Sequence, residues 1–97
     1  MYTAVTELTV SPGNRPEFEQ AFTASMKATL TAVPGLRRSL LLRPNEDDRS
    51  YLAVLEFTDK DAYQAYLASD AFHSAHHGQR RVFADSHRLS TYTDVAG

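Results

Sequence analysis

The sequence predicts a single α+β domain, with four strands and two main helices in the order β-α-β-β-α-β. Short segments rich in Thr, Val, Leu and Tyr alternate with two segments whose apolar residues recur at helical spacing. Clusters of Pro, Gly, Asn and Asp separate these segments. A chain of 97 residues has room for one hydrophobic core, so we expect one domain over residues 1–97.

The first half of the chain predicts a strand, a long helix and a second strand. Tyr2–Val10 is rich in β-branched residues and is followed by the turn "SPGN". A helix capped by Asn14 is expected up to Pro34-Gly35, with one apolar stripe formed by Phe18, Phe22, Met26 and Leu30. The second strand is expected over Leu36–Arg43, and alternation places on one of its faces Leu36, Arg38, Leu40 and Leu42.

The second half predicts a hairpin partner, a helix and a last strand. The polar turn "PNEDDR" leads into a strand over Ser50–Phe57. Thr58 and Asp61 have the spacing of a capping box, so we expect a helix over Asp59–Ser69 and a further short helix from Asp70 to Gly78. The fourth strand is expected over His87–Val95. This order is the split βαβ arrangement of ferredoxin-like domains, which have a four-stranded antiparallel sheet.

The third strand is apolar on both of its faces. Tyr51, Ala53, Leu55 and Phe57 alternate with Leu52 and Val54, whereas a sheet covered by helices on one face usually carries polar residues on the other. An apolar second face indicates an interface. We therefore expect a homodimer in which two sheets pack face to face.

The composition excludes several classes of protein. A net charge of −2 without a basic stripe argues against a nucleic-acid partner. The absence of cysteine excludes disulfides and thiolate chemistry. No apolar run approaches the roughly 20 residues of a membrane helix, and the N-terminus does not resemble a signal peptide. We expect a soluble, cytoplasmic protein without a membrane partner.

Three of the four histidines are crowded into "DAFHSAHHGQ". His73 and His77 have the i, i+4 spacing of helical zinc ligands, but no glutamate between them completes a metalloprotease motif, so we interpret them as solvated residues and expect no metal site. His76 follows Phe72 by one turn, on the expected inner side of the helix. It is either a histidine at the edge of the core, bonded to a backbone carbonyl, or an imidazole that faces an aromatic pocket.

The aromatic residues permit two interpretations. Large rings fill the core of a small domain, but buried tyrosine hydroxyls need partners, and apolar walls with a few polar groups are typical of a small-molecule site. The candidate catalytic residues are Tyr63, Tyr66 and His76, and the candidate substrate-binding residues are Phe22, Tyr51, Phe57 and Phe72. Arg37, Arg38 and Arg43 could bind a carboxylate or phenolate ligand, but we expect them to cover the sheet edge or to pair with Glu7 and Glu56.

Over nearly its whole length the sequence resembles the antibiotic biosynthesis monooxygenase family, small dimeric α+β barrels of the ferredoxin-like type. The resemblance is carried by "VPGLRRSLLL", by "YLAVLEFTDKDAYQAYLASDAFHSAHH" and by the β-rich end. The family's strand-end Trp corresponds to Phe57, the Asn of its quinone-forming members corresponds to Ala53, and a family Tyr is retained as Tyr63. In the heme-degrading branch the axial His lies in a motif that matches "FHSAH", which assigns it to His76. That branch also uses an Asn on the first strand, and the nearest position here is Thr6.

The resemblance implies a cofactor-independent monooxygenase that oxidises a small aromatic or polyketide-like substrate with O2. Such an enzyme needs a dry aromatic cavity, a group that accepts or orients a phenolic proton, and donors that stabilise an oxyanion. Tyr63, Tyr66 and His76 would supply these groups, with aromatic walls around them. A heme-binding or heme-degrading monooxygenase is the first alternative, with heme as its cofactor, and a non-catalytic dimer that binds a small ligand is the second.

Overall fold

The computed structural model describes residues 1–46, 48–69 and 84–96, and of residues 84–87 only the backbone. The observed order confirms the predicted β-α-β-β-α-β arrangement. The elements are β1 (Tyr2–Val10), the 3-10 helix η1 (Pro12–Asn14), α1 (Arg15–Ala32), β2 (Leu36–Leu42), β3 (Tyr51–Phe57), α2 (Lys60–Leu67) and β4 (Ala84–Thr93). The last strand begins and ends earlier than the predicted range His87–Val95.

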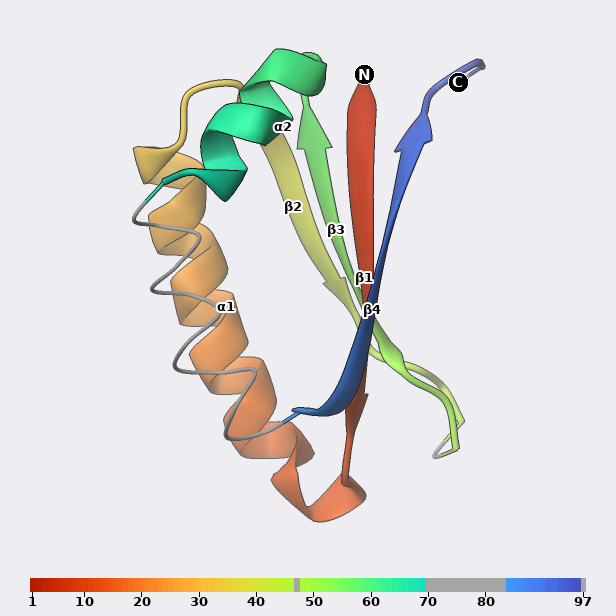
Figure 1. The fold of residues 1–97 in the computed structure, drawn as a ribbon. Coiled ribbons are helices and arrows are strands. Elements are labelled where there is room, and N and C mark those ends of the chain that lie inside the picture. The colour runs from red at the N-terminus through yellow and green to blue at the C-terminus, as the bar shows by residue number, and fades with distance from the viewer. Residues whose placement is uncertain (47, 70–83, 97) are drawn as a thin grey trace.

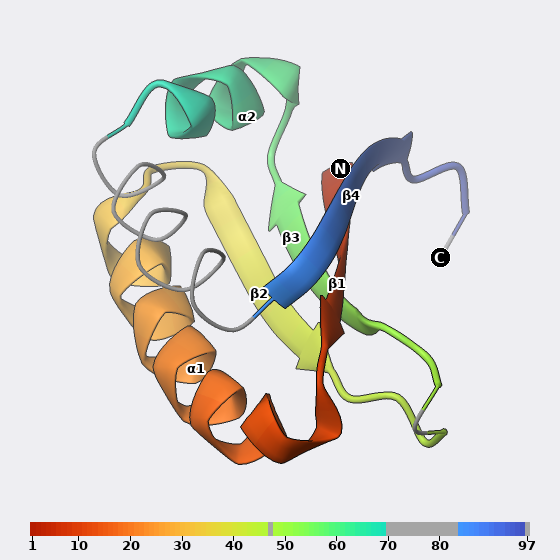
Figure 2. The same ribbon diagram turned by 60° about the horizontal axis from the view of Figure 1, so that its bottom comes forward.

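The four strands form one antiparallel sheet in the order β2-β3-β1-β4. Both described helices lie on one face of this sheet, α1 along β2 and α2 across the upper end of the sheet (Figure 1). The turned view shows both helices beside the sheet again, with β4 crossing in front of β1 (Figure 2). The fold is therefore the expected ferredoxin-like α+β fold.

Helix α1 follows the predicted apolar stripe only in part. Phe18 is buried and Phe22 half-buried, but Leu30 is 41% exposed. Near the helix end the buried residue is Thr29, whose hydroxyl donates to the carbonyl of Ser25. The prediction for Leu30 was wrong because a strict four-residue spacing rotates around a helix with 3.6 residues per turn.

The start of each helix differs in detail from the sequence prediction. Asn14 occupies the cap position of α1, but its side chain makes no capping hydrogen bond, since η1 leads directly into the helix. The predicted capping box of Thr58 and Asp61 was wrong. Asp59 caps α2, and its carboxylate accepts a hydrogen bond of 2.8 Å from the amide of Ala62.

The inner face of the sheet, which we define as the face toward the helices, carries the core. One cluster of buried residues comprises Ala4, Val33, Leu36, Phe57, Tyr63 and Tyr66. The other comprises Leu8, Val10, Phe18, Tyr51 and Ala53. Tyr51 and Phe57 are inner-face residues at opposite ends of β3, so the two clusters occupy opposite ends of the sheet.

An irregularity at Arg37 changes the face on which the start of β2 lies. Leu36 pairs with Phe57 and is buried in the core, whereas Arg38 pairs with the next residue, Glu56. The prediction that Leu36 shares a face with Arg38, Leu40 and Leu42 was therefore wrong, because an extra residue in one strand reverses the alternation.

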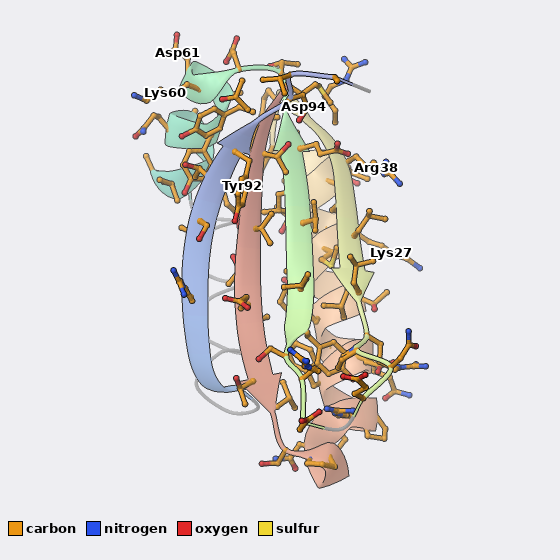
Figure 3. All side chains as sticks on the ribbon, turned by 90° about the vertical axis from the view of Figure 1, so that its right-hand side faces the viewer. Lys27, Arg38, Lys60, Asp61, Tyr92 and Asp94 are labelled. Carbon is orange, nitrogen blue, oxygen red and sulfur yellow. The ribbon has the colours of Figure 1, made fainter. Side chains whose placement is uncertain are left out.

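The outer face of the sheet, turned away from the helices, is apolar at its centre. Paired residues on neighbouring strands share a face, so Leu40, Val54 and Val5 form one row. Leu42 and Leu52 belong to a second row, which ends at Glu7 on β1. Figure 3 looks onto this face, with Arg38 and Tyr92 on it. Within the described residues, Leu42 is 45% and Tyr92 56% exposed. Arg38 pairs with Glu56 at 3.6 Å, as expected.

Candidate functional site

The structure brings three of the predicted site residues together at the upper end of the sheet. Phe57 ends β3, while Tyr63 and Tyr66 lie on the inner side of α2. The ring centroid of Phe57 lies 5.4 Å from that of Tyr63 and 5.5 Å from that of Tyr66. We name Phe57, Tyr63, Tyr66 and the neighbouring Tyr2 the upper aromatic cluster.

The local sequence explains why these rings meet. The Asp59 cap starts α2 directly after β3, so Tyr63 and Tyr66 lie one turn apart on the side that faces the sheet. Gly35 permits the close approach of α2 to the turn before β2. It has φ +86°, and a β-carbon there would lie 2.6 Å from the β-carbon of Ala62. The amide of Thr58 donates to the carbonyl of Gly35 at 2.9 Å.

Two other predicted site residues lie at the opposite end of the core. The ring of Tyr51 is 4.9 Å from that of Phe18, which in turn is 5.3 Å from that of Phe22. The hydroxyl of the buried Tyr51 donates to the carboxylate of Glu19. Tyr51 and Phe22 are thus separated from Tyr63 and Tyr66. His76 and Phe72 lie outside the described residues.

Glu19 is the centre of a polar cluster at this lower end. Arg43 donates two hydrogen bonds to it, 2.7 and 2.6 Å long. The hydrogen bonds from Arg43 and Tyr51 lower the pKa of Glu19 to about 2, against the opposing effect of burial. Burial and the hydrogen bond to Glu19 raise the pKa of Tyr51. We had expected Arg43 to cover the sheet edge or to pair with Glu7 or Glu56, but it pairs with Glu19. The hydroxyl of Tyr51 has the same structural partner.

Between the two ends, several of the described residues on the inner face are partly or largely exposed. Thr6 pairs with Ala53 on one side and with Leu89 on the other, so all three lie on the inner face. Ala53 is buried, Thr6 and Leu55 are half-buried, and Leu89 is 45% exposed. Thr91, paired with Ala4, is exposed as well. We name Thr6, Leu55, Leu89 and Thr91 the open strip.

The open strip includes residues that sequence reasoning missed. Leu55 was recognised only as part of one face of the third strand, and Leu89 and Thr91 only as part of the last strand. Alternation puts Leu89 and Thr91 on one face of a strand, and the pairing of β4 with β1 makes that face the inner one. Thr6 and Ala53, the positions at which the family resemblance implies asparagines in different branches, are direct neighbours in the β1–β3 ladder.

The electrostatic environment defines what Tyr63 can do. Burial raises the pKa of Tyr63, and the negative charge that Tyr2 would carry on ionisation raises it further. Tyr63 is consequently protonated at neutral pH. Its hydroxyl can donate a hydrogen bond to a ligand oxygen, but it is a poor acceptor of a proton.

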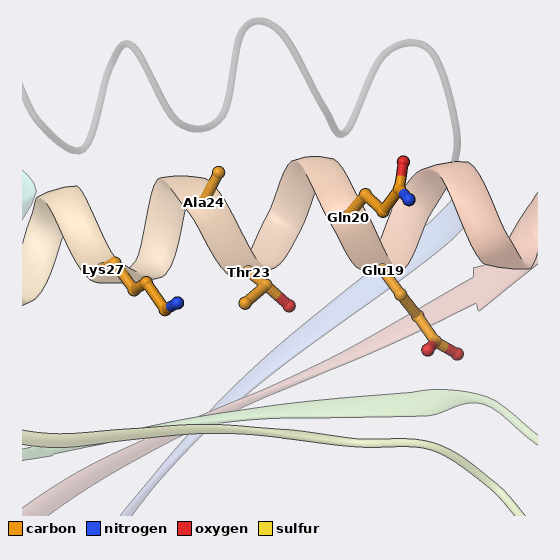
Figure 4. A pocket seen from close by; sticks show the side chains of 5 residues that line it. All are labelled: Glu19, Gln20, Thr23, Ala24 and Lys27. Carbon is orange, nitrogen blue, oxygen red and sulfur yellow. The ribbon is translucent and has the colours of Figure 1, made fainter.

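A surface groove of about 470 Å³ lies along α1 and is lined by Glu19, Gln20, Thr23, Ala24 and Lys27. Figure 4 shows Glu19, Thr23 and Lys27 on the side of α1 that faces the sheet. The described residues that line this groove all belong to α1, and none of them is a predicted site residue.

The described ranges also bear on metals and membranes. Within them, no group of three or more His, Cys, Asp or Glu side chains could hold a metal ion. No helix among the described residues has both the length and the apolar character needed to cross a lipid bilayer.

Comparison with known proteins gives a consistent set of relatives. A family model described as antibiotic biosynthesis monooxygenase matches residues 1–78. Deoxynogalonate monooxygenase from Streptomyces nogalater is 35% identical over 79 residues, which span 81% of this chain and 66% of that protein.

Two solved structures share the fold over its whole extent. One is an asparagine-to-alanine mutant of SnoaB, a cofactor-independent oxygenase from Streptomyces nogalater. It has a TM-score of 0.83 at 30% identity, and the match covers 99% of this chain and 94% of SnoaB. The other is MhuD, a heme-degrader from Mycobacterium tuberculosis with two hemes bound in its active site. It has a TM-score of 0.82 at 26% identity, and the match covers 100% of this chain and 98% of MhuD.

Proposed function

The chain belongs to the antibiotic biosynthesis monooxygenase family, and we propose that it is a cofactor-independent monooxygenase acting on a small aromatic or polyketide-like molecule. The similarity to deoxynogalonate monooxygenase and to SnoaB supports this reaction type. The observation that carries the proposal is the open strip beside the upper aromatic cluster. An apolar surface with a few hydroxyl groups is suited to a planar, oxygen-bearing ring system.

The proposed binding mode follows from the side chains of the inner face. Leu55 and Leu89 offer partly exposed apolar surface to the rings of the substrate. Thr6 and Thr91 offer hydroxyls along the strip, and the upper aromatic cluster closes one end of it. Phe57 takes part as a buried ring that supports Tyr63 and Tyr66.

In the proposed reaction the substrate is its own reductant. A base removes a proton from the aromatic substrate, and the resulting anion transfers electrons to O2. A new C–O bond forms at the reacting carbon, one oxygen atom remains there as a quinone carbonyl, and the other leaves as water. The protonated Tyr63 would stabilise the oxyanion by donating a hydrogen bond, with Tyr66 beside it. We assign the base to His76, which lies outside the described residues.

Oxygen uptake tests this proposal directly. With an anthrone substrate and a chelator present, we expect enzyme-dependent O2 consumption and formation of the quinone. Tyr63→Phe removes the donor while keeping the ring, and should lower kcat by about tenfold to a hundredfold if the hydroxyl stabilises the oxyanion. Tyr92→Phe, on the outer face, is the matched control and should leave the rate unchanged. Equal rates for wild type and Tyr63→Phe would contradict the assigned role.

Heme binding is the second candidate, supported by the likeness to MhuD. The described residues would contribute the walls of the inner face, because His76, which the family resemblance implies would hold the heme, lies outside them. A bound heme would supply oxygen activation at its iron. Titration with hemin distinguishes the two candidates: a saturable Soret shift that is lost in His76→Ala supports the heme function, and its absence in the wild type removes it.

We also propose that two copies of the chain pack through the outer faces of their sheets. The apolar row Leu40–Val54–Val5 crosses three strands, and Leu42–Leu52 extends the apolar surface over β2 and β3. The ion pair of Arg38 and Glu56 lies at their margin. Continuous apolar surface bounded by charged residues is typical of a dimer interface. Such a dimer would leave both inner faces free for substrate.

A further inference from the structure

Tyr2 is the residue of the upper aromatic cluster that sequence reasoning did not assign to the site. It is the first residue of β1 and pairs with Phe57, which places it on the inner face. Its ring centroid lies 5.2 Å from that of Tyr63, with the planes inclined by 39°. Tyr63 is buried, whereas Tyr2 is only half-buried. The two rings come from elements that are far apart in the sequence, β1 and α2.

The geometry suits a pair of hydroxyl donors. Tyr63 belongs to the buried cluster, and the half-buried Tyr2 packs against it from the edge of the core, where a tyrosine keeps its hydroxyl available to solvent or ligand. No hydrogen bond of the Tyr2 or Tyr63 hydroxyl to another described side chain accompanies the ring contact. The pair adjoins the open strip, because Tyr2 precedes Ala4 and Thr6 along the inner face of β1.

We propose that Tyr2 and Tyr63 act as a two-hydroxyl clamp on one oxygen of the ligand, and that the preferred ligand form is the phenolate of an aromatic substrate. This inference rests on the proposed function and deepens it, since it names the ionised form of the substrate and a second residue that binds it. Two O–H donors hold a charged oxygen more strongly than they hold a neutral one. The same arrangement disfavours ionisation of Tyr63, whose pKa is raised by burial and by the neighbouring Tyr2.

Binding of a coloured phenol tests the clamp without turnover. The probe is 1,8-dihydroxyanthraquinone, a stable quinone whose phenol and phenolate forms absorb at different wavelengths. Titrating it across pH against wild type, Tyr2→Phe, Tyr63→Phe and the double variant gives a dissociation constant for each form. Tyr92→Phe is the control, and thermal unfolding establishes that each variant is folded.

The clamp predicts selective losses. Each single variant should bind the phenolate about tenfold more weakly, as expected for loss of a hydrogen bond to a charged group, while affinity for the protonated phenol changes little. The double variant should lose less than the product of the two single effects, because both donors share one oxygen. Wild-type affinity of Tyr2→Phe for the phenolate would overturn the proposal. Equal weakening for both forms would also overturn it, since that is the result of altered packing alone.

The two proposals fail in different experiments. If the probe binds and the clamp variants behave as predicted but no substrate consumes O2, the clamp stands and the monooxygenase function falls. If O2 is consumed and Tyr2→Phe retains full phenolate binding, the function stands and the clamp falls. A wild-type protein that does not bind the probe overturns the clamp outright.

Discussion

At the scale of single residues, Glu19 links three elements of the fold. It lies on α1, receives a hydrogen bond from Tyr51 at the start of β3, and binds Arg43 just after β2. Arg43 is largely exposed, so the ion pair alone contributes little to stability. Tyr51 is fully buried, and its hydroxyl depends on the Glu19 carboxylate.

We therefore predict that Glu19→Ala lowers the free energy of unfolding by about 1–3 kcal/mol, because it leaves a buried hydroxyl without its acceptor. Urea denaturation measures the change. Glu17→Ala is the matched control, since Glu17 is an exposed carboxylate in the first turn of the same helix. The explanation is wrong if both substitutions cost the same. It is also wrong if Glu19→Ala remains as costly in a Tyr51→Phe background.

The same contacts predict a pH dependence. The pKa of Glu19 falls from 4.5 to about 2 on folding, so the folded state binds its proton less tightly than the unfolded state does. The stability contributed by Glu19 is present above pH 4.5 and is lost as the pH falls toward 2. Melting temperatures of the wild type should converge with those of Glu19→Gln across this window. A constant difference between the two proteins from pH 6 to pH 2 would contradict the assignment.

At the scale of elements, the placement of α2 decides where Tyr63 lies. Gly35 has a positive φ, and its carbonyl accepts from Thr58 immediately before α2. A side chain at this position meets Ala62 in the first turn of the helix. Because Tyr63 is the next residue, the turn before β2 positions the upper aromatic cluster.

Gly35→Ala should destabilise the protein by at least about 1–2 kcal/mol, the cost of left-handed backbone for an L-residue, with added cost from the contact with Ala62. It should also weaken ligand binding by shifting Tyr63. Gly13→Ala is the control, because a β-carbon at Gly13 meets nothing within 4 Å. Chemical denaturation and probe binding measure both effects, and an unchanged stability of Gly35→Ala would refute the role of this turn.

At the scale of the whole molecule, the two faces of the sheet have separate tasks in our proposal. The inner face holds the core and the open strip, and the outer face carries the apolar rows. A chain of this size buries a limited share of its surface, so covering the outer face by a second copy would add stability as well.

The dimer predicts a specific response to charge. Val54 lies at the centre of the outer face, between Leu40 and Val5. Val54→Glu should give a monomer in sedimentation velocity at micromolar concentration, because it places a charge in the apolar interface. Ala28→Glu, at an exposed position of α1, should remain a dimer. A wild-type protein that sediments as a monomer at this concentration would refute the proposed interface.

Local patterns in the sequence determined the order of the elements and the location of most buried residues. Alternation along Tyr51–Phe57 defined both faces of β3, and helical spacing placed Tyr63 and Tyr66 on the inner side of α2. These predictions succeeded because periodicity reports which face of one element is buried, and burial dominates the energetics of folding.

Only the tertiary structure decided which distant residues meet. Arg43 could have paired with several acids, and the register of the sheet together with the position of α1 selected Glu19. Alternation along the second strand could not predict the irregularity at Arg37. The contact between Tyr2 and Tyr63 joins residues that are far apart in the sequence. The sequence determined the elements and their buried faces through short-range spacing. Partner choice depends on strand register and helix placement, which arise only when the whole core packs together.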